Sequence, residues 1–206
     1  MKKLIAAILL ICIVSSFSSC IETEAGAPAV YDLSAEAKIE TAENDSLSVD
    51  DVRAIINKAI EICENNDAVK IDSNTTVYKR DISKIDLEFV KTLTPSNFSD
   101  HFEVYREQLN NIKEVAIQML MDYFPEENIF VLGNDRVYNA ILPTHTFYME
   151  NSDDPAKEKV VYVLNGDILY KEGEGDLQLL YPTPELAKIE AHFWDLNRQS
   201  GRPVVQ

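Results

Sequence analysis

The chain has 206 residues, of which 46% are hydrophobic and only three are cysteine. This is enough apolar material for the core of one ordinary domain or two small ones, which excludes a disordered or fibrous chain and leaves no disulfide framework. Nineteen Lys and Arg stand against 35 Asp and Glu, a formal net charge of −16 at pH 7, and this sign excludes a general nucleic-acid binder.

The first twenty residues have the pattern of an export signal. Lys2 and Lys3 form a basic start, Leu4 to Val14 is an uncharged apolar stretch, and small residues follow it. A membrane-spanning helix requires about 18 or more apolar residues, and this stretch is shorter. We therefore expect residues 1–19 to be a signal peptide and the mature protein to lie outside the cytoplasm.

Phe17-Ser18-Ser19-Cys20 closes this segment. It resembles the lipobox of bacterial lipoproteins, in which an aliphatic residue and two small residues precede an invariant cysteine; Phe17 stands where the family usually has Leu. The resemblance implies cleavage before Cys20, diacylglyceryl transfer to its sulfur, and an anchor of acyl chains such as palmitate in a bacterial membrane. It covers the export segment alone.

Residues 20–47 are predicted to be an acidic tether that begins at the lipidated Cys20. Between Ile21 and Asp50 there are eight acidic residues and one base, Lys38. Few large apolar side chains accompany them, and such a composition favours a solvated segment. Val30 to Leu33 is the one apolar cluster; a docking strand or a nascent helix would fit it, and the composition around it favours an unpacked segment.

Residues 48–206 are predicted to form a single domain that begins with a helix. Ser48 and Asp51 have the spacing of a capping box, and apolar residues then recur with helical period as far as Cys63. On that stripe Cys63 is predicted to be a buried small hydrophobe rather than a nucleophile. Weaker patterns predict short strands at 69–71 and 75–78 and a short helix near 83–92.

The clearest helix is predicted from Asp100 to Phe124, because Pro125 ends it. Its apolar residues have the 3-4 spacing of a coiled-coil seam. The seam consists of Phe102, Tyr105, Leu109, Ile112, Ala116, Met119 and Tyr123. Further apolar residues widen this stripe, which favours packing within the domain over dimerisation.

The pattern after Pro125 changes to strands, and a last helix follows Thr183-Pro184. The expected strands are 129–132, 137–142, 146–149, 160–164, 168–170 and 177–181, with a turn at 133–135 and an Asn165-Gly166 hairpin. The predicted class is α+β: a helical N-terminal half packed on a four- or five-stranded antiparallel sheet with a C-terminal helix. This architecture is similar to that of the cystatin-like and ketosteroid-isomerase-like cone folds, by analogy alone.

No motif for catalysis or for a cofactor is present. The three histidines lack metal-ligand spacing, and no nucleophile elbow or phosphate-binding glycine loop is found. Two acidic loops supply weak calcium candidates, although their spacing is not that of an EF-hand and favours solvated turns. These candidates are Asp153, Asp154, Glu172, Glu174 and Asp176.

Tyrosines recur through the predicted strands and provide a candidate ligand face. They are Tyr138, Tyr148, Tyr162, Tyr170 and Tyr181. If one sheet face carries them all, it presents aromatic rings to a ligand or peptide. Ordinary sheet packing is the favoured interpretation, because strands are rich in tyrosine in any case.

Taken together, these patterns favour a membrane-anchored envelope lipoprotein with a non-catalytic binding or accessory domain. Its expected partners are the lipid bilayer, through acylated Cys20, and an envelope protein, polymer or small ligand. One alternative is a small envelope hydrolase, which requires a pKa-shifted acid or a His–acid pair inside the largest pocket. The other is a dimeric assembly factor, which requires an exposed stripe on the long helix.

Overall fold

The computed structural model describes residues 28–35, 48–124, 128–137, 140–150, 154, 156–164 and 167–201. The helices are α1 (Val49–Asn65), α2 (Leu87–Lys91), α3 (Ser99–Tyr123) and α4 (Pro184–Gln199), with a 3-10 turn η1 (Leu33–Ala35). The strands are β1 (Val30–Asp32), β2 (Ala68–Lys70), β3 (Thr76–Tyr78), β4 (Ile129–Val137), β5 (Ala140–Glu150), β6 (Lys159–Leu164), β7 (Asp167–Glu172) and β8 (Gln178–Tyr181). The predicted α+β class is confirmed.

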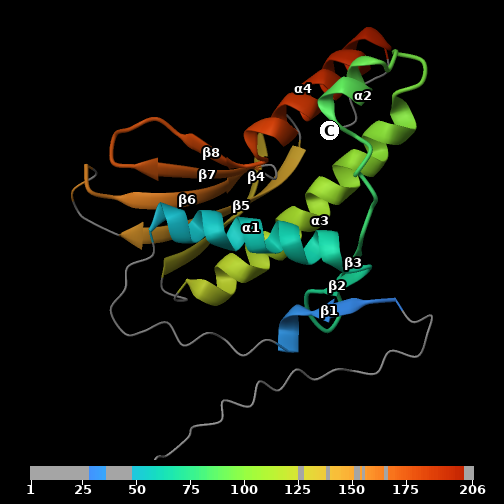
Figure 1. Cartoon of the computed structure of the whole chain (residues 1–206). Helices are drawn as coiled ribbons and strands as arrows, with labels where there is room; N and C mark the ends of the chain where they lie inside the picture. The colour runs from blue at the N-terminus through green and yellow to red at the C-terminus, as the bar shows by residue number, and fades with distance from the viewer. Residues whose placement is uncertain are drawn as a thin grey trace, which may run out of the picture.

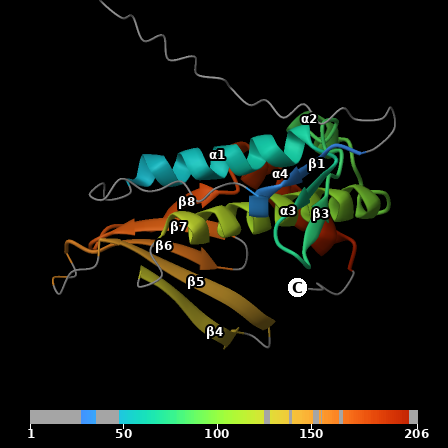
Figure 2. The same ribbon diagram turned by 90° about the horizontal axis from the view of Figure 1, so that it is seen from below.

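The larger sheet has the strand order β4-β5-β6-β7-β8 and is antiparallel throughout. Helices α1 and α3 lie along one face of it, and α4 projects beyond it beside α2 (Figures 1 and 2). The turn predicted at 133–135 is wrong, because β4 continues through it. Between Leu132 and Asp135 the register with β5 shifts by one residue, so the Gly133-Asn134 pair belongs to a β-bulge.

The start of α1 has the predicted capping box. The Ser48 hydroxyl accepts a hydrogen bond from the Asp51 N–H, and the Asp51 carboxylate accepts one from the Ser48 N–H at 2.7 Å. The Ser48 hydroxyl also donates to the Asp51 carboxylate at 2.6 Å, and this bond, together with that of the Ser48 N–H, lowers the pKa of Asp51. At the other end of α1 Cys63 is 3% exposed, and burial raises the pKa of its thiol to about 12. The prediction of a buried cysteine is confirmed.

The apolar stripe of α3 lies inside the domain. Phe102, Leu109, Ile112, Ala116 and Met119 are all less than 10% exposed, which confirms the prediction of intramolecular packing and leaves these side chains no surface for a dimer seam. An aromatic cluster then joins α3 to the last helix. The Phe193 ring lies 5.2 Å from that of Phe102 and 5.4 Å from that of Tyr105.

Three short strands form a second sheet, in which β1 is parallel to β2 and β3 is antiparallel to it. The predicted tether therefore contains a strand of the domain, and the favoured interpretation of an unpacked Val30–Leu33 cluster is wrong. The Ala29 N–H donates to the Asp67 carboxylate at 2.9 Å, and Leu33 is 5% exposed. The β1 segment docks because Leu33 is part of the main hydrophobic core and because β2 supplies hydrogen-bond partners for the backbone of β1.

The predicted signal peptide, residues 1–19, and the predicted lipidation residue Cys20 lie outside the described residues. Of the helices that the structure describes, none has the length and hydropathy required to cross a bilayer.

Candidate functional site

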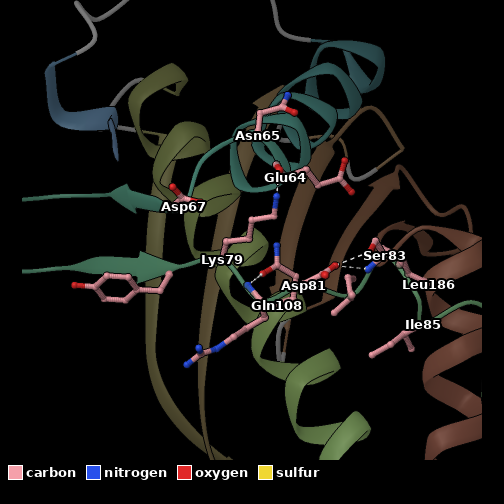
Figure 3. A pocket seen from close by; sticks show the side chains of 12 residues that line it. Glu64, Asn65, Asp67, Lys79, Asp81, Ser83, Ile85, Gln108 and Leu186 are labelled. Carbon is pink, nitrogen blue, oxygen red and sulfur yellow. Dashed lines mark hydrogen bonds between the residues drawn. The ribbon is translucent and has the colours of Figure 1, made fainter. Parts of the chain in front are cut away.

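A groove of about 1230 Å³ lies between the small sheet and helices α1, α3 and α4. We call it the α1–α4 groove, because its walls are the end of α1, the loop between β3 and α2, one turn of α3 and the start of α4 (Figure 3). Its lining consists of Glu64, Asn65, Asp67, residues 78–83, Ile85, Gln108 and Leu186.

Two amide side chains of α3 form hydrogen bonds to the backbone of β3 and of the loop that follows it, and one of them, Gln108, lines the groove. Strand β3 is the edge of its sheet, so some of its backbone groups lack a neighbouring strand. Gln108 Oε1 accepts a hydrogen bond from the Arg80 N–H at 2.6 Å, and Asn111 Nδ2 donates to the Tyr78 carbonyl at 2.7 Å. The helix thereby completes the edge of the sheet.

Gln108 is 1% exposed, yet it lines the groove. Its Oε1 accepts the hydrogen bond from the Arg80 N–H, while its Nε2 makes no hydrogen bond to any part of the chain that the structure describes. This nitrogen is not among the buried side-chain atoms that lack a partner in the described ranges, so it reaches the open space of the groove. Sequence reasoning missed this residue; the available signal was a polar side chain on the otherwise apolar stripe of the long helix.

Several charged side chains in and beside the groove are held by close neighbours. Arg80 forms an ion pair with Glu107 at 2.6 Å, which raises the pKa of the guanidinium and lowers that of the carboxyl. Asp81 accepts hydrogen bonds from the hydroxyl and N–H of Ser83 at 2.6 and 3.0 Å. These bonds lower the pKa of Asp81, so it is held in its charged form.

The charges nearest α1 are arranged differently. Lys79 Nζ donates a hydrogen bond to the backbone carbonyl of Glu64, and the Asp67 carboxylate accepts one from the Ala29 N–H. The Glu64 carboxylate makes no hydrogen bond or ion pair with any described residue. It is exposed, and it is therefore available to a ligand.

The opposite end of the groove is apolar and rigid. Ile82, Ile85 and Leu186 lie there, and Figure 3 shows Ile85 and Leu186 on the side away from Glu64 and Asn65. The Leu186 N–H donates to the Thr183 hydroxyl at 3.4 Å, and its carbonyl accepts from the Tyr105 hydroxyl at 2.9 Å. Both backbone groups are satisfied, which holds this end in place.

The described lining of the groove holds no His–acid pair. No histidine or cysteine is found among the described residues that line it. The low pKa of Asp81 is the reverse of what a general acid needs near neutral pH. The criterion set for a hydrolase is therefore not met in this groove.

A second cluster of titratable groups lies where α3, α4 and the large sheet approach one another. Desolvation lowers the pKa of Lys113 and of His145, and the Lys113 charge lowers the latter further. Asp167 stands at the start of β7, where desolvation and the nearby Glu190 raise its pKa. His145 Nδ1 is buried without a hydrogen-bond partner. No ion pair joins these groups within the ranges that the structure describes.

The predicted tyrosine face is divided by the strand register. Tyr170 and Tyr181 point into the core, where their hydroxyls donate to Glu172 at 3.1 Å and to the Leu109 carbonyl at 2.8 Å. Tyr162 lies opposite Thr146 and Leu169, so it is on the other face of the sheet, and Tyr148 is two residues from Thr146 on that same face. Tyr138 lies outside the described residues.

The two acidic loops proposed for calcium lie next to each other. Gly173, with φ of +53°, donates its N–H to the Glu158 carbonyl at 2.7 Å, and a Cβ at Gly173 would lie 2.5 Å from the Ala156 carbonyl oxygen. The candidates Asp154, Glu172, Glu174 and Asp176 come from these loops, and Asp153 lies outside the described residues. In the described ranges no three acidic, His or Cys side chains are arranged to hold a metal ion.

Comparisons of the chain with protein-family models, with curated proteins and with solved structures give no match. The chemistry of the groove and of the cluster around Lys113 is therefore the guide to function.

Proposed function

We propose that this protein is a lipoprotein of a bacterial envelope and that its domain binds another molecule in the α1–α4 groove without catalysing a reaction. The anchor is supported by the lipobox-like Phe17-Ser18-Ser19-Cys20. The binding function rests on one observation: the groove of about 1230 Å³ has an apolar end at Ile85 and Leu186 and an acidic residue, Glu64, on the other side.

The anchor is tested by producing the full chain in a bacterial host and measuring its intact mass and its partitioning into detergent. We expect a mass that corresponds to an acylated N-terminal Cys20, and partitioning with membranes. Cys20→Ala removes both, whereas Cys12→Ala, a matched change within the export segment, leaves both unchanged. A wild-type protein that stays in the aqueous phase after cleavage at another position contradicts the anchor.

A small hydrolase is the second candidate, because the pKa values of Lys113, His145 and Asp167 are all displaced in one region. It is tested with p-nitrophenyl acetate and p-nitrophenyl glycosides between pH 5 and pH 8. We expect no turnover above buffer. Turnover that disappears in His145→Gln and persists in His192→Gln would replace the binding proposal by the hydrolase.

A further inference from the structure

We infer that the α1–α4 groove takes an extended polypeptide segment in which an apolar side chain stands beside a basic one. This inference rests on the proposed binding function and names its ligand class. The groove volume of about 1230 Å³ is larger than the roughly 300–1000 Å³ of pockets for single small molecules. Its two ends also differ in chemistry, which suits a ligand with two kinds of side chain.

The apolar end supplies a seat for an aliphatic side chain. Ile82 and Leu186 are half-buried, and Ile85 is 9% exposed. An incoming Leu or Ile would cover their remaining apolar surface and remove it from water. Since Thr183 and Tyr105 already fix the Leu186 backbone, little conformational entropy is lost at this end when a ligand binds.

The middle of the groove suits a peptide backbone. Gln108 and the exposed Asn65 both line the groove and place two primary amides there. Primary amides match the donor and acceptor pattern of a peptide unit. Asn111 already bonds the Tyr78 carbonyl at the end of β3, and the segment binds through side-chain amides rather than as a further strand.

The polar end selects a positive charge. Arg80 is neutralised by Glu107, and Lys79 donates to the Glu64 carbonyl. The described lining has three carboxylates, Glu64, Asp67 and Asp81, against these two bases. The Glu64 carboxylate is exposed without a described partner. The whole chain has a formal net charge of −16 at pH 7. This negative charge attracts a basic segment and repels phosphates and acidic polymers.

The wall between the two ends is held in shape before any ligand arrives. Ser83 donates twice to Asp81, and the Ile85 N–H donates to the Ile82 carbonyl at 2.8 Å. Gln108 holds the Arg80 N–H at the start of the same loop. A loop with its own hydrogen bonds keeps its ligand groups in position and lowers the cost of binding.

The test measures the fluorescence anisotropy of labelled hexapeptides with the full chain in detergent micelles. The probe alternates leucine and lysine, and its ends are acetylated and amidated. Two comparison peptides replace lysine by glutamate or leucine by serine. We expect the leucine–lysine peptide to bind at least about tenfold more tightly than either, because each comparison removes one of the two matched chemistries.

Two pairs of variants locate the peptide. Glu64→Gln should weaken binding about threefold to fivefold, and Ile82→Ser about tenfold. Glu174→Gln in the β7–β8 loop and Leu179→Ser on β8 make the same chemical changes on exposed residues that do not line the groove, and they should leave binding unchanged. Circular dichroism shows whether each variant is folded. Because Glu64 is exposed and without a described partner, its variant tests the site even if Ile82→Ser unfolds.

Equal binding of the serine–lysine peptide, or equal loss in Glu64→Gln and Glu174→Gln, would show general attraction to an acidic protein and overturn the inference. A second measurement separates this failure from that of the proposed function. If chitotriose shifts the backbone amide NMR signals of residues 78–83 and no peptide does, the ligand is a neutral glycan and the binding function stands. If neither probe shifts them, the binding function fails as well.

Discussion

Replacing Gln108 by Met tests the link between α3 and the edge of the small sheet. Met has nearly the same length as Gln and a similar helix propensity. The change removes the Oε1 acceptor that holds the Arg80 N–H at 2.6 Å. It leaves the Asn111 bond to the Tyr78 carbonyl in place, so the fold should persist with one backbone donor unsatisfied.

The expected cost in the free energy of unfolding is about 1–2 kcal/mol. A buried donor that loses its acceptor costs about 1–3 kcal/mol, and the lower part of this range applies because the adjacent groove gives water access to Arg80. For a domain of this size the loss corresponds to a fall of about 3–6 °C in Tm. Both values refer to the folded domain without ligand.

Urea denaturation, followed by the fluorescence of Trp194, measures this difference. Gln118→Met is the matched control on the same helix, since Gln118 is half-buried and donates only to Asp122 at 3.2 Å. It should change the free energy of unfolding by less than about 0.5 kcal/mol. If Gln108→Met is as stable as this control, the Arg80 bond does not join α3 to the sheet and the account of the groove wall is refuted.

Three further outcomes are expected. Phe193→Ala should lower the free energy of unfolding by about 3–5 kcal/mol in urea, because the ring is fully buried against Phe102; a loss below about 1 kcal/mol would contradict the packing. Ser48→Ala should cost about 1 kcal/mol at pH 7. The hydrogen bonds of Ser48 lower the pKa of Asp51 in the folded state. Their stabilisation is therefore present at pH values above 3.8, the ordinary pKa of the carboxyl, and shrinks as the pH falls below it. Thermal unfolding of both proteins at pH 7 and at pH 3 measures this difference. Cys63 should resist iodoacetamide at pH 8, since with a pKa of about 12 only about one thiol in ten thousand is ionised; mass spectrometry of its peptide should show alkylation in urea alone, and rapid native labelling would contradict its burial.

Local signals predicted the helices well. The start of α1 depends on Ser48 and Asp51, three residues apart, and the start of α4 on Thr183 and the proline after it. Such contacts lie within one turn of chain, so their chemistry can be read directly from the sequence. Cys63 was placed correctly for the same reason, since helical period alone puts it on the apolar face of α1.

Features that depend on distant pairing were missed. β1 docks on β2 through Ala29 and Asp67, which are 38 residues apart, and no local pattern near Val30 indicates that partner. The groove likewise combines four separate segments. The division of the tyrosines, by contrast, was available: a two-residue hairpin at 165–166 places Tyr162 opposite Leu169, and the neighbouring Tyr170 then belongs to the other face.

The docked β1 strand sets how far the domain can stand from a lipid anchor. Nine residue steps separate Cys20 from Ala29, and a fully extended chain of that length spans at most about 30 Å. A free tether up to Ser48 would span about 95 Å. With an acylated Cys20, the small sheet and the groove that its Tyr78 lines are therefore confined to the layer next to the bilayer. A partner of this groove would then meet it close to the membrane surface.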